Sequence, residues 1–277
     1  MSGKGVTRAV VIVLIYYTLY LTATLFQSDF WGNILSPAGA LLSAVLLLHA
    51  FRHAAKTDFR RCIWLSFCLA SLSWAAADLS WATDSFFLST NPASDPFSLF
   101  FYFATSFFLA AGLIVFALNT IRRWPAMQLL TDIEAVSSAC LLLLWIFFFD
   151  KSLTGITVIY ADGWYSAASL FIDLFLFIGT AVWYMSVRPW KLTFVMRLLL
   201  TSVILYSLSD IVYYYLYFKN LYVPNTVIDA LYMASLLGLA VGSIMVPDTY
   251  IVPEQGRKFT DKIGYILKSL ILLPLPV

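Results

Sequence analysis

Apolar residues recur along the chain in runs of about twenty, and short polar connections separate the runs. A helix that crosses the roughly 30 Å hydrocarbon layer of a bilayer needs about 20 such residues. The runs are continuous, as in residues 141–146, whereas the strands of a membrane barrel alternate apolar and polar positions. The pattern therefore predicts an all-α, polytopic transmembrane helix bundle of about eight spans joined as antiparallel hairpins. The predicted spans are residues 9–26, 33–51, 62–83, 97–118, 130–149, 164–186, 194–217 and 226–246.

The composition agrees with this pattern. Of the 277 residues, 61% are hydrophobic and 12% are charged, and that charged fraction is about half the usual ~25% of soluble proteins. So few charges cannot cover the surface of a water-soluble globule of this size. This excludes an ordinary cytosolic enzyme, a disordered chain and a nucleic-acid binder, and it makes the lipid bilayer the first expected partner.

The basic residues predict the orientation. All seventeen Lys and Arg except Lys151 and Lys219 lie on one side of the predicted bundle. The positive-inside rule puts that side in the cytoplasm, so both ends of the eight-span core are expected there, in a cell inner (cytoplasmic) membrane. The first span, 9–26, is longer than the 7–15 apolar residues of a signal peptide, so we expect an uncleaved anchor.

The chain divides into a transmembrane bundle, residues 1–248, and a basic cytoplasmic juxtamembrane segment, residues 249–277. Two interpretations of the second part stay open. It is an amphipathic helix with Lys258, Lys262 and Lys268 away from its apolar face, or it is the start of a further span that is truncated at Val277. Of the two, we expect truncation.

No soluble catalytic motif occurs in the sequence, neither a phosphate-binding glycine loop nor a zinc-protease or nucleophile-elbow pattern. His49 and His53 share a helix face, but the chain has no third histidine, so we expect no metal or haem site. The three cysteines lie in apolar stretches, where cysteine is usually a small core residue. We therefore expect no catalytic residue and no cofactor in this chain.

Four aspartates lie well inside the predicted spans: Asp78, Asp173, Asp210 and Asp229. Each costs about 2.5–3.5 kcal/mol at mid-membrane, so the retention of four by chance is improbable. With a rise of about 1.5 Å per residue, three of them share a layer about 6 Å below the outer edge of the core, and Asp173 lies just beneath. Snorkelling or local hydrogen bonding is the structural alternative, above all for Asp229.

Aromatic residues accompany these acids. Trp74 and Trp81 lie four residues before and three after Asp78, which puts them on its helix face, and tyrosines flank Asp210 in the same way. No intramembrane Lys or Arg is available to pair with the acids, because Arg197 lies at the cytoplasmic end of its span. Acids and aromatic rings without a facing cation favour a cavity for a cationic or hydrogen-bonding ligand. The candidate ligand-binding residues are Asp78, Asp173, Asp210, Asp229, Trp74, Trp81, Tyr206, Tyr213, Tyr214 and Tyr232.

A parallel internal repeat is also indicated. The segment around Asp78 matches that around Asp210, and the next helix of each copy has a tyrosine ten residues before a glycine. These pairs are Tyr102 with Gly112, and Tyr232 with Gly242. The copies are four spans apart, so they have the same orientation, and spans five and six are a degenerate middle copy with Asp173.

At these residues the chain resembles the multi-span N-terminal sensor regions of bacterial GGDEF (diguanylate cyclase) and GGDEF–EAL signalling proteins. The resemblance covers about residues 60–246. It rests on three short motifs: Asp95-Pro96-Phe97 before the helix with Tyr102, Thr131-Asp132-Ile133 before the helix with Leu144-Trp145, and Asp229-Ala230-Leu231-Tyr232. It implies a membrane input module whose cytoplasmic output domain, a diguanylate cyclase in full-length relatives, is absent from this chain.

The sequence thus predicts a sensor that binds an unknown small ligand in an outer-leaflet cavity and passes a change of packing to a cytoplasmic output domain. A homodimer is compatible with such a module. The alternative is a small-solute or cation transporter that uses the same acids. The inner halves of the spans carry none of these four aspartates and few polar groups, which favours sensing. A structural or assembly protein is a third interpretation.

Overall fold

The computed structural model describes residues 3–54, 59–88, 95–120, 123–144, 159–186, 194–219 and 221–245. The described chain is all-helical. Its elements are α1 (Gly3–Leu25), α2 (Asp29–His53), α3 (Arg60–Thr83), the π-helical η1 (Asp84–Leu88), α4 (Pro96–Thr120), α5 (Arg123–Leu144), α6 (Ile159–Ser186), α7 (Phe194–Phe218) and α8 (Val227–Ile244). The prediction of a multi-span helical membrane protein is confirmed, because six of these helices are long and apolar enough to cross a bilayer.

The fifth and sixth predicted spans are helices, but they do not meet that criterion over their described residues. In α6 the apolar stretch is Ala168–Val182, which is shorter than a full span. Helix α5 begins at Arg123, seven residues before the predicted start, because Pro125 is tolerated in a first helical turn. The end of the fifth predicted span, residues 145–149, and the predicted segment 249–277 lie outside the described residues.

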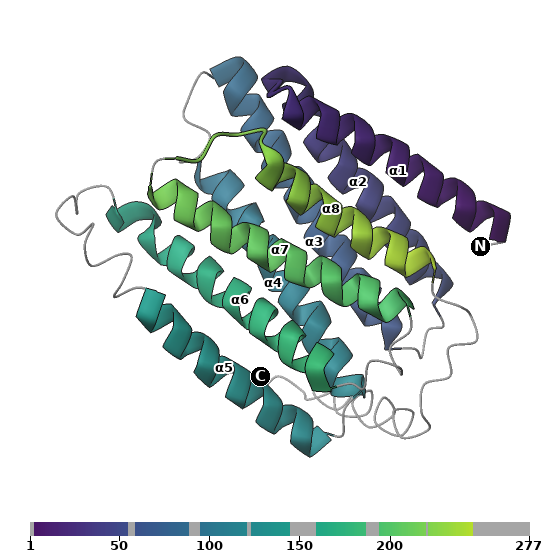
Figure 1. The fold of residues 1–277 in the computed structure, drawn as a ribbon, viewed down its shortest axis with the longest axis vertical. Helices are drawn as coiled ribbons and strands as arrows, with labels where there is room; N and C mark the ends of the chain where they lie inside the picture. Colours follow the sequence, from purple (N-terminus) through teal and green to yellow (C-terminus); the bar gives the residue numbers. More distant parts are fainter. Residues whose placement is uncertain are drawn as a thin grey trace, which may run out of the picture.

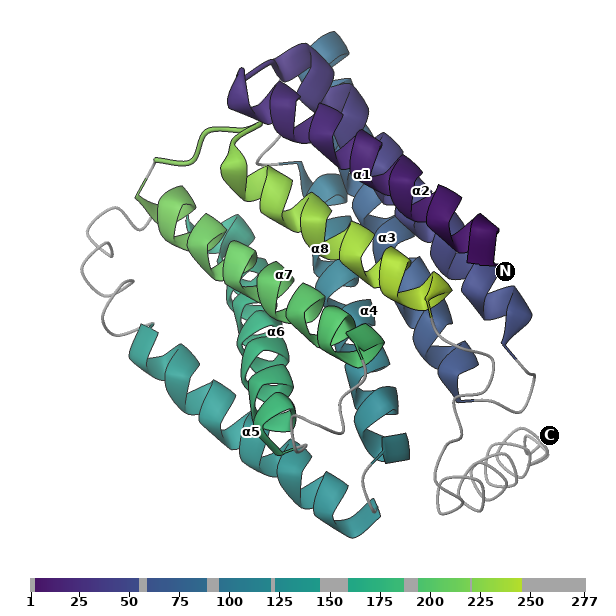
Figure 2. The same ribbon diagram turned by 45° about the vertical axis from the view of Figure 1, so that its right-hand side comes forward.

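The helices form one bundle in which α1 and α5 lie at opposite edges (Figure 1). Helix α3 packs between α2 and α4, and α7 packs between α6 and α8. Two further contacts close the bundle, α2 against α8 and α4 against α6. The turned view in Figure 2 shows α7 and α8 on one side of the bundle, with α3 and α4 behind them. We call the end of the bundle with the α7–α8 connection the cavity end, because a polar cavity lies there.

Small residues allow the helices to approach closely in the half of the bundle away from the cavity end. The Ser43 hydroxyl of α2 lies 3.0 Å from that of Ser71 in α3 and donates a 2.8 Å hydrogen bond to the carbonyl of Leu236 in α8. Buried Ala40, Ala44 and Leu47 continue the same α2 surface. This half is therefore tightly packed and mostly apolar.

Gly238 and Gly242 of α8 pack closely against α7. A Cβ atom on Gly242 would lie 2.7 Å from a Leu199 side-chain carbon, and one on Gly238 would lie 2.2 Å from Ser202 Oγ. Gly112 has the same role between α4 and α3, where a Cβ would lie 2.5 Å from the Phe67 ring. Glycine thus lets the helices of both pairs approach closely.

The connection from α3 to α4 was not anticipated from the sequence. Helix α3 continues into the π-helical turn η1, and α4 begins at Pro96 directly after Asp95. The Asp95 carboxylate accepts hydrogen bonds from the Ser98 N–H at 2.8 Å and from the Ser80 hydroxyl of α3 at 2.8 Å. It therefore caps α4 and joins it to α3, next to the turn that carries Asp78.

Candidate functional site

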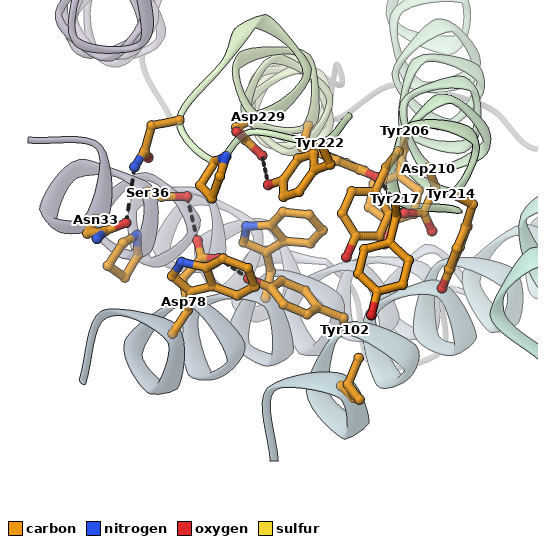
Figure 3. A pocket seen from close by; sticks show the side chains of 18 of the residues that line it. Asn33, Ser36, Asp78, Tyr102, Tyr206, Asp210, Tyr214, Tyr217, Tyr222 and Asp229 are labelled. Carbon is orange, nitrogen blue, oxygen red and sulfur yellow. Dashed lines mark hydrogen bonds between the residues drawn. The ribbon is translucent and has the colours of Figure 1, made fainter. Parts of the chain in front are cut away.

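A cavity of about 100 Å³ lies at the cavity end, where seven of the eight described α-helices and the α7–α8 loop contribute side chains (Figure 3). Its lining is unusually rich in hydroxyl, carboxyl and indole groups for the interior of a membrane bundle. The lining residues are Tyr20, Asn33, Ser36, Pro37, Trp74, Asp78, Trp81, Leu99, Tyr102, Ser169, Tyr206, Asp210, Tyr213, Tyr214, Tyr217, Tyr222, Pro224, Asn225, Asp229 and Tyr232.

Asp78 of α3 is 8% exposed and is held by hydroxyl donors from two neighbouring helices. The Ser36 hydroxyl of α2 donates to Oδ2 at 2.5 Å, and the Tyr102 hydroxyl of α4 donates to Oδ1 at 2.8 Å. Figure 3 shows both hydrogen bonds converging on this carboxylate. Each carboxylate oxygen has two lone pairs, so Asp78 keeps acceptor capacity for a further donor in the cavity.

Asp210 of α7 has a similar arrangement in the other half of the bundle. It is 9% exposed, and the Tyr232 hydroxyl of α8 donates to its Oδ1 at 2.5 Å. The carboxyl group of Asp173 in α6 lies in its neighbourhood; it is fully buried, and neither of its oxygens has a hydrogen-bond partner among the described residues. Figure 3 shows Asp78 and Asp210 at opposite ends of a row of aromatic side chains.

Asp229 has a structural explanation of its own. Its Oδ2 accepts a 2.9 Å hydrogen bond from the Thr226 N–H and completes a capping box at the start of α8. Its Oδ1 accepts a 3.0 Å hydrogen bond from the Tyr222 hydroxyl in the α7–α8 loop. Burial and the nearby Asp229 charge raise the pKa of Tyr222 well above its ordinary value, so Tyr222 remains a donor at neutral pH.

Aromatic rings fill the space between the acids. The Trp74 ring lies 4.9 Å from Tyr102, 4.7 Å from Tyr232 and 5.9 Å from Tyr206, measured between ring centroids. Its indole Nε1 is buried and makes no hydrogen bond of ordinary geometry among the described residues, but it lies near the Asp78 carboxyl group. The indole N–H is therefore a further donor in the surroundings of Asp78.

The α7–α8 loop closes the cavity against α2. Asn225, at a φ of 58°, donates from Nδ2 to Asp29 Oδ1 at 3.1 Å and to Asn33 Oδ1 at 3.3 Å. The contact requires a glycine on α2, because a Cβ on Gly32 would lie 2.0 Å from Asn225 Oδ1. Positive φ is tolerated by asparagine better than by most residues, which suits this position.

The structure gathers nine of the ten candidate residues around one cavity, and the tenth, Asp173, is not among its lining residues. Sequence reasoning missed several other lining residues. The sequence singled out Tyr102 as the repeat match of Tyr232 and in the family resemblance, but not as a lining residue. Its match with Tyr232, a predicted ligand-binding residue, was the signal that could have placed it in the cavity. Ser36 and Asn33 carried a weaker signal, as polar residues one turn apart in an apolar span beside Pro37.

The charges of the cavity are unbalanced. Among the described residues its lining contains three carboxyl groups and no Lys, Arg or His side chain. The described part of the chain also contains no cluster of three or more acid, cysteine and histidine ligands fit to hold a metal ion. The arrangement is therefore suited to binding protons, hydrogen-bond donors or organic cations.

Comparison with known proteins identifies no family for this chain. The sequence matches no protein-family model, no curated protein and no solved structure. The fold and the cavity are therefore the basis for any functional conclusion: the chain is a multi-span helical membrane protein with buried acids and an aromatic cluster.

Proposed function

We propose that this chain is the membrane-embedded input module of a bacterial signalling protein and that it binds a small ligand in the cavity. The observation that carries the proposal is the placement of Asp78 and Asp210 in one cavity, each tied by a tyrosine to the next helix. Buried acids at such a position are costly, and function is the usual reason for their retention.

The bundle consists of two parallel four-helix halves in this proposal, α1–α4 and α5–α8. The Tyr102–Asp78 and Tyr232–Asp210 hydrogen bonds support the equivalence. So does the packing of Gly112 on Phe67 and of Gly242 on Leu199, because Phe67 and Leu199 each precede the aspartate of their helix by eleven residues. The neighbours also correspond: α2 contacts α8 as α6 contacts α4.

A ligand between the halves acts on their relative packing. It contacts the α3–α4 pair through Asp78 and the α7–α8 pair through Asp210, so it stabilises whichever packing brings these groups to it. Helix α7 has 25 residues, about 37 Å at a rise of roughly 1.5 Å per residue, which is enough to carry a tilt to the far end of the bundle. The charge distribution orients that end toward the cytoplasm of an inner membrane, with the cavity outside.

The resemblance to GGDEF-associated sensor regions suggests how the signal leaves the membrane. In the proposal, the bundle acts on a cytoplasmic output domain that follows the membrane region. Sensing is preferred over transport because the described half of the bundle away from the cavity is closed by apolar and small residues such as Leu47, Phe67 and Leu239. A transporter needs access to its binding site from both faces.

The experiment uses the purified chain in lipid nanodiscs and a library of small polar compounds, screened by thermal unfolding. A true ligand raises the midpoint by mass action, and the rise should disappear in Asp78→Asn and in Tyr102→Phe. Asp132→Asn, an exposed α5 acid outside the cavity, is the matched control and should respond like the wild type. Uptake of the same compound into sealed proteoliposomes, abolished by Asp78→Asn, would establish transport and overturn the sensor proposal.

A further inference from the structure

Four hydroxyl groups that line the cavity donate their hydrogen atoms to its acids. These donors are Ser36 and Tyr102 on Asp78, Tyr222 on Asp229, and Tyr232 on Asp210. A hydroxyl has one hydrogen, so each of these oxygens can only accept a further hydrogen bond. An ionised carboxyl group is an acceptor as well. A ligand that contacts this part of the wall must therefore bring hydrogen-bond donors of its own.

The wall of the cavity also has no positive charge. Whichever of Asp78, Asp210 and Asp229 is ionised, no Lys, Arg or His side chain of the described lining balances it. An anion would face carboxyl groups without a cation to pair with, and burial of an unpaired charge is costly. A cation is instead attracted by any carboxylate in the wall. The charge thus favours a cation, and the engaged hydroxyls favour one with N–H groups.

Asp78 offers the most complete surroundings for such a cation. Both of its oxygens accept hydrogen bonds from other helices, at 2.5 Å from Ser36 and at 2.8 Å from Tyr102, so the carboxyl group is fixed in place (Figure 3). Asp229, by contrast, is engaged in the capping box of α8 and with Tyr222. Asp78 keeps lone pairs for the donors of a ligand.

Aromatic rings border Asp78 on its own helix face and on α4. Trp74 lies four residues before Asp78 and Trp81 three residues after it, and both line the cavity. The ring centroid of Trp74 is 4.9 Å from that of Tyr102 and 4.7 Å from that of Tyr232. Aromatic faces attract cations, and tryptophan does so most strongly. The carbon atoms of an organic cation therefore meet ring faces next to the carboxyl group.

The indole N–H of Trp74 is a second, independent indication of a binding site. Trp74 is 7% exposed and lines the cavity, and its Nε1 makes no hydrogen bond of ordinary geometry among the described residues, although it lies near Asp78. Buried polar groups are normally hydrogen-bonded, so an exception calls for a specific explanation. A ligand that reaches both the indole and Asp78 supplies one. The volume of about 100 Å³ suits a ligand of a few non-hydrogen atoms.

We propose that the cavity binds a small organic ammonium ion whose N–H groups donate to the Asp78 carboxylate and whose carbon atoms lie against the Trp74 and Tyr102 rings. The inference rests on the proposed function and names its ligand class. A primary ammonium carries three N–H donors. These are enough for Asp78, for hydroxyl oxygens of the wall and for Asp210 in the other half of the bundle.

The probe is tert-butylammonium chloride, added to the full chain in lipid nanodiscs while thermal unfolding is recorded. Two compounds of similar shape accompany it: tetramethylammonium keeps the charge without an N–H group, and tert-butanol is neutral. Potassium chloride controls for ionic strength, and the buffer is phosphate because Tris is itself a primary ammonium. We expect a saturable rise of the midpoint with tert-butylammonium, about tenfold weaker binding of tetramethylammonium, and no saturable rise with tert-butanol or potassium chloride.

Three variants test the assigned residues. Asp78→Asn keeps the shape of the side chain and removes its charge, so the response to tert-butylammonium should be lost. Trp74→Leu removes the ring face and should weaken binding about tenfold, whereas the control Asp132→Asn should match the wild type. Where Asp78→Asn does not fold, Tyr102→Phe takes its place, because it keeps the ring but releases Asp78, and it should lose the response as well.

The outcomes separate this inference from the function on which it rests. Equal binding of tetramethylammonium overturns the requirement for N–H groups, and a response to tert-butanol alone overturns the ligand class; both leave the sensor proposal intact. An unchanged response in Asp78→Asn places the ion elsewhere and overturns the inference. If neither these probes nor the screened library stabilises the chain through the cavity, the proposed function itself fails.

Discussion

Tyr232 of α8 donates a 2.5 Å hydrogen bond to Asp210 of α7, a residue 22 positions earlier in the chain. Tyr102 of α4 does the same for Asp78 of α3 at 2.8 Å. In both cases the bond joins consecutive antiparallel helices at the cavity end. The two acids are therefore parts of helix pairs, and anything that moves either acid also moves the helix that follows it.

Removal of either tyrosine hydroxyl should destabilise the bundle. Tyr232→Phe and Tyr102→Phe each leave a buried carboxylate oxygen without its donor, which costs about 1–3 kcal/mol. The measurement is the free energy of unfolding in mixed micelles. Tyr184→Phe, at an exposed α6 position, is the control and should change stability much less. A double-mutant cycle of Tyr232→Phe with Asp210→Asn should be non-additive; additive losses would show that the hydrogen bond is not formed.

Gly32→Ala should displace the α7–α8 loop, because the new Cβ would lie 2.0 Å from Asn225 Oδ1. We expect a loss of about 1–3 kcal/mol of stability, as for other overpacked contacts. Gly179→Ala is the matched substitution, since its Cβ would lie at an ordinary 3.6 Å from Ile133. In an Asn225→Gly background, Gly32→Ala should cost little more. An equally large loss in that background would show that the loop contact is not what requires glycine.

Asp95 should make stability depend on pH in the acid range. Partial burial opposes its ionisation, but hydrogen bonds from the Ser98 N–H, the Ser80 hydroxyl and the Phe97 N–H outweigh this and lower its pKa. A lowered folded pKa gives stability that is full above the ordinary value of 3.8 and is lost as pH falls through the folded pKa.

The test compares Asp95→Ala with the wild type between pH 7 and pH 3. At pH 7 the variant should be less stable by about 1 kcal/mol, the usual cost of a lost N-cap. The difference should shrink as the pH falls below about 4, because the unfolded chain then binds a proton at Asp95 that the folded carboxylate does not yet bind. A difference that stays constant to pH 3 would show that the charge of Asp95 does not contribute.

The orientation can be measured with reporter fusions. The basic residues predict cytoplasmic signals after Arg61, Arg123 and Lys191, and external signals near Asp95 and Lys219. The described helices α1 to α4 alternate in direction, so fusions at Arg61 and Asp95 must give opposite results whichever side is cytoplasmic. Cytoplasmic signals at both Asp95 and Lys219 would reverse the proposed placement of the cavity.

Much of this protein followed from the sequence alone. Hydropathy located the helices, since each apolar run is a local property of some twenty residues. The residue counts from each helix end put Asp78 and Asp210 at the same depth, since the rise per residue is constant. The sequence also matched Tyr102 with Tyr232, but it did not predict that each tyrosine bonds the aspartate of the preceding helix, as the structure shows.

Only the tertiary structure decided which side chains meet across the bundle. The Ser36 bond to Asp78 and the fit of Asn225 on Gly32 depend on how each helix is rotated about its axis. Hydropathy does not determine that rotation, because lipid tails and the bundle interior are both apolar, so a lipid-facing and a buried helix surface look alike in sequence. The close packing of small residues and the satisfaction of buried polar groups set it instead, and both require all the helices at once.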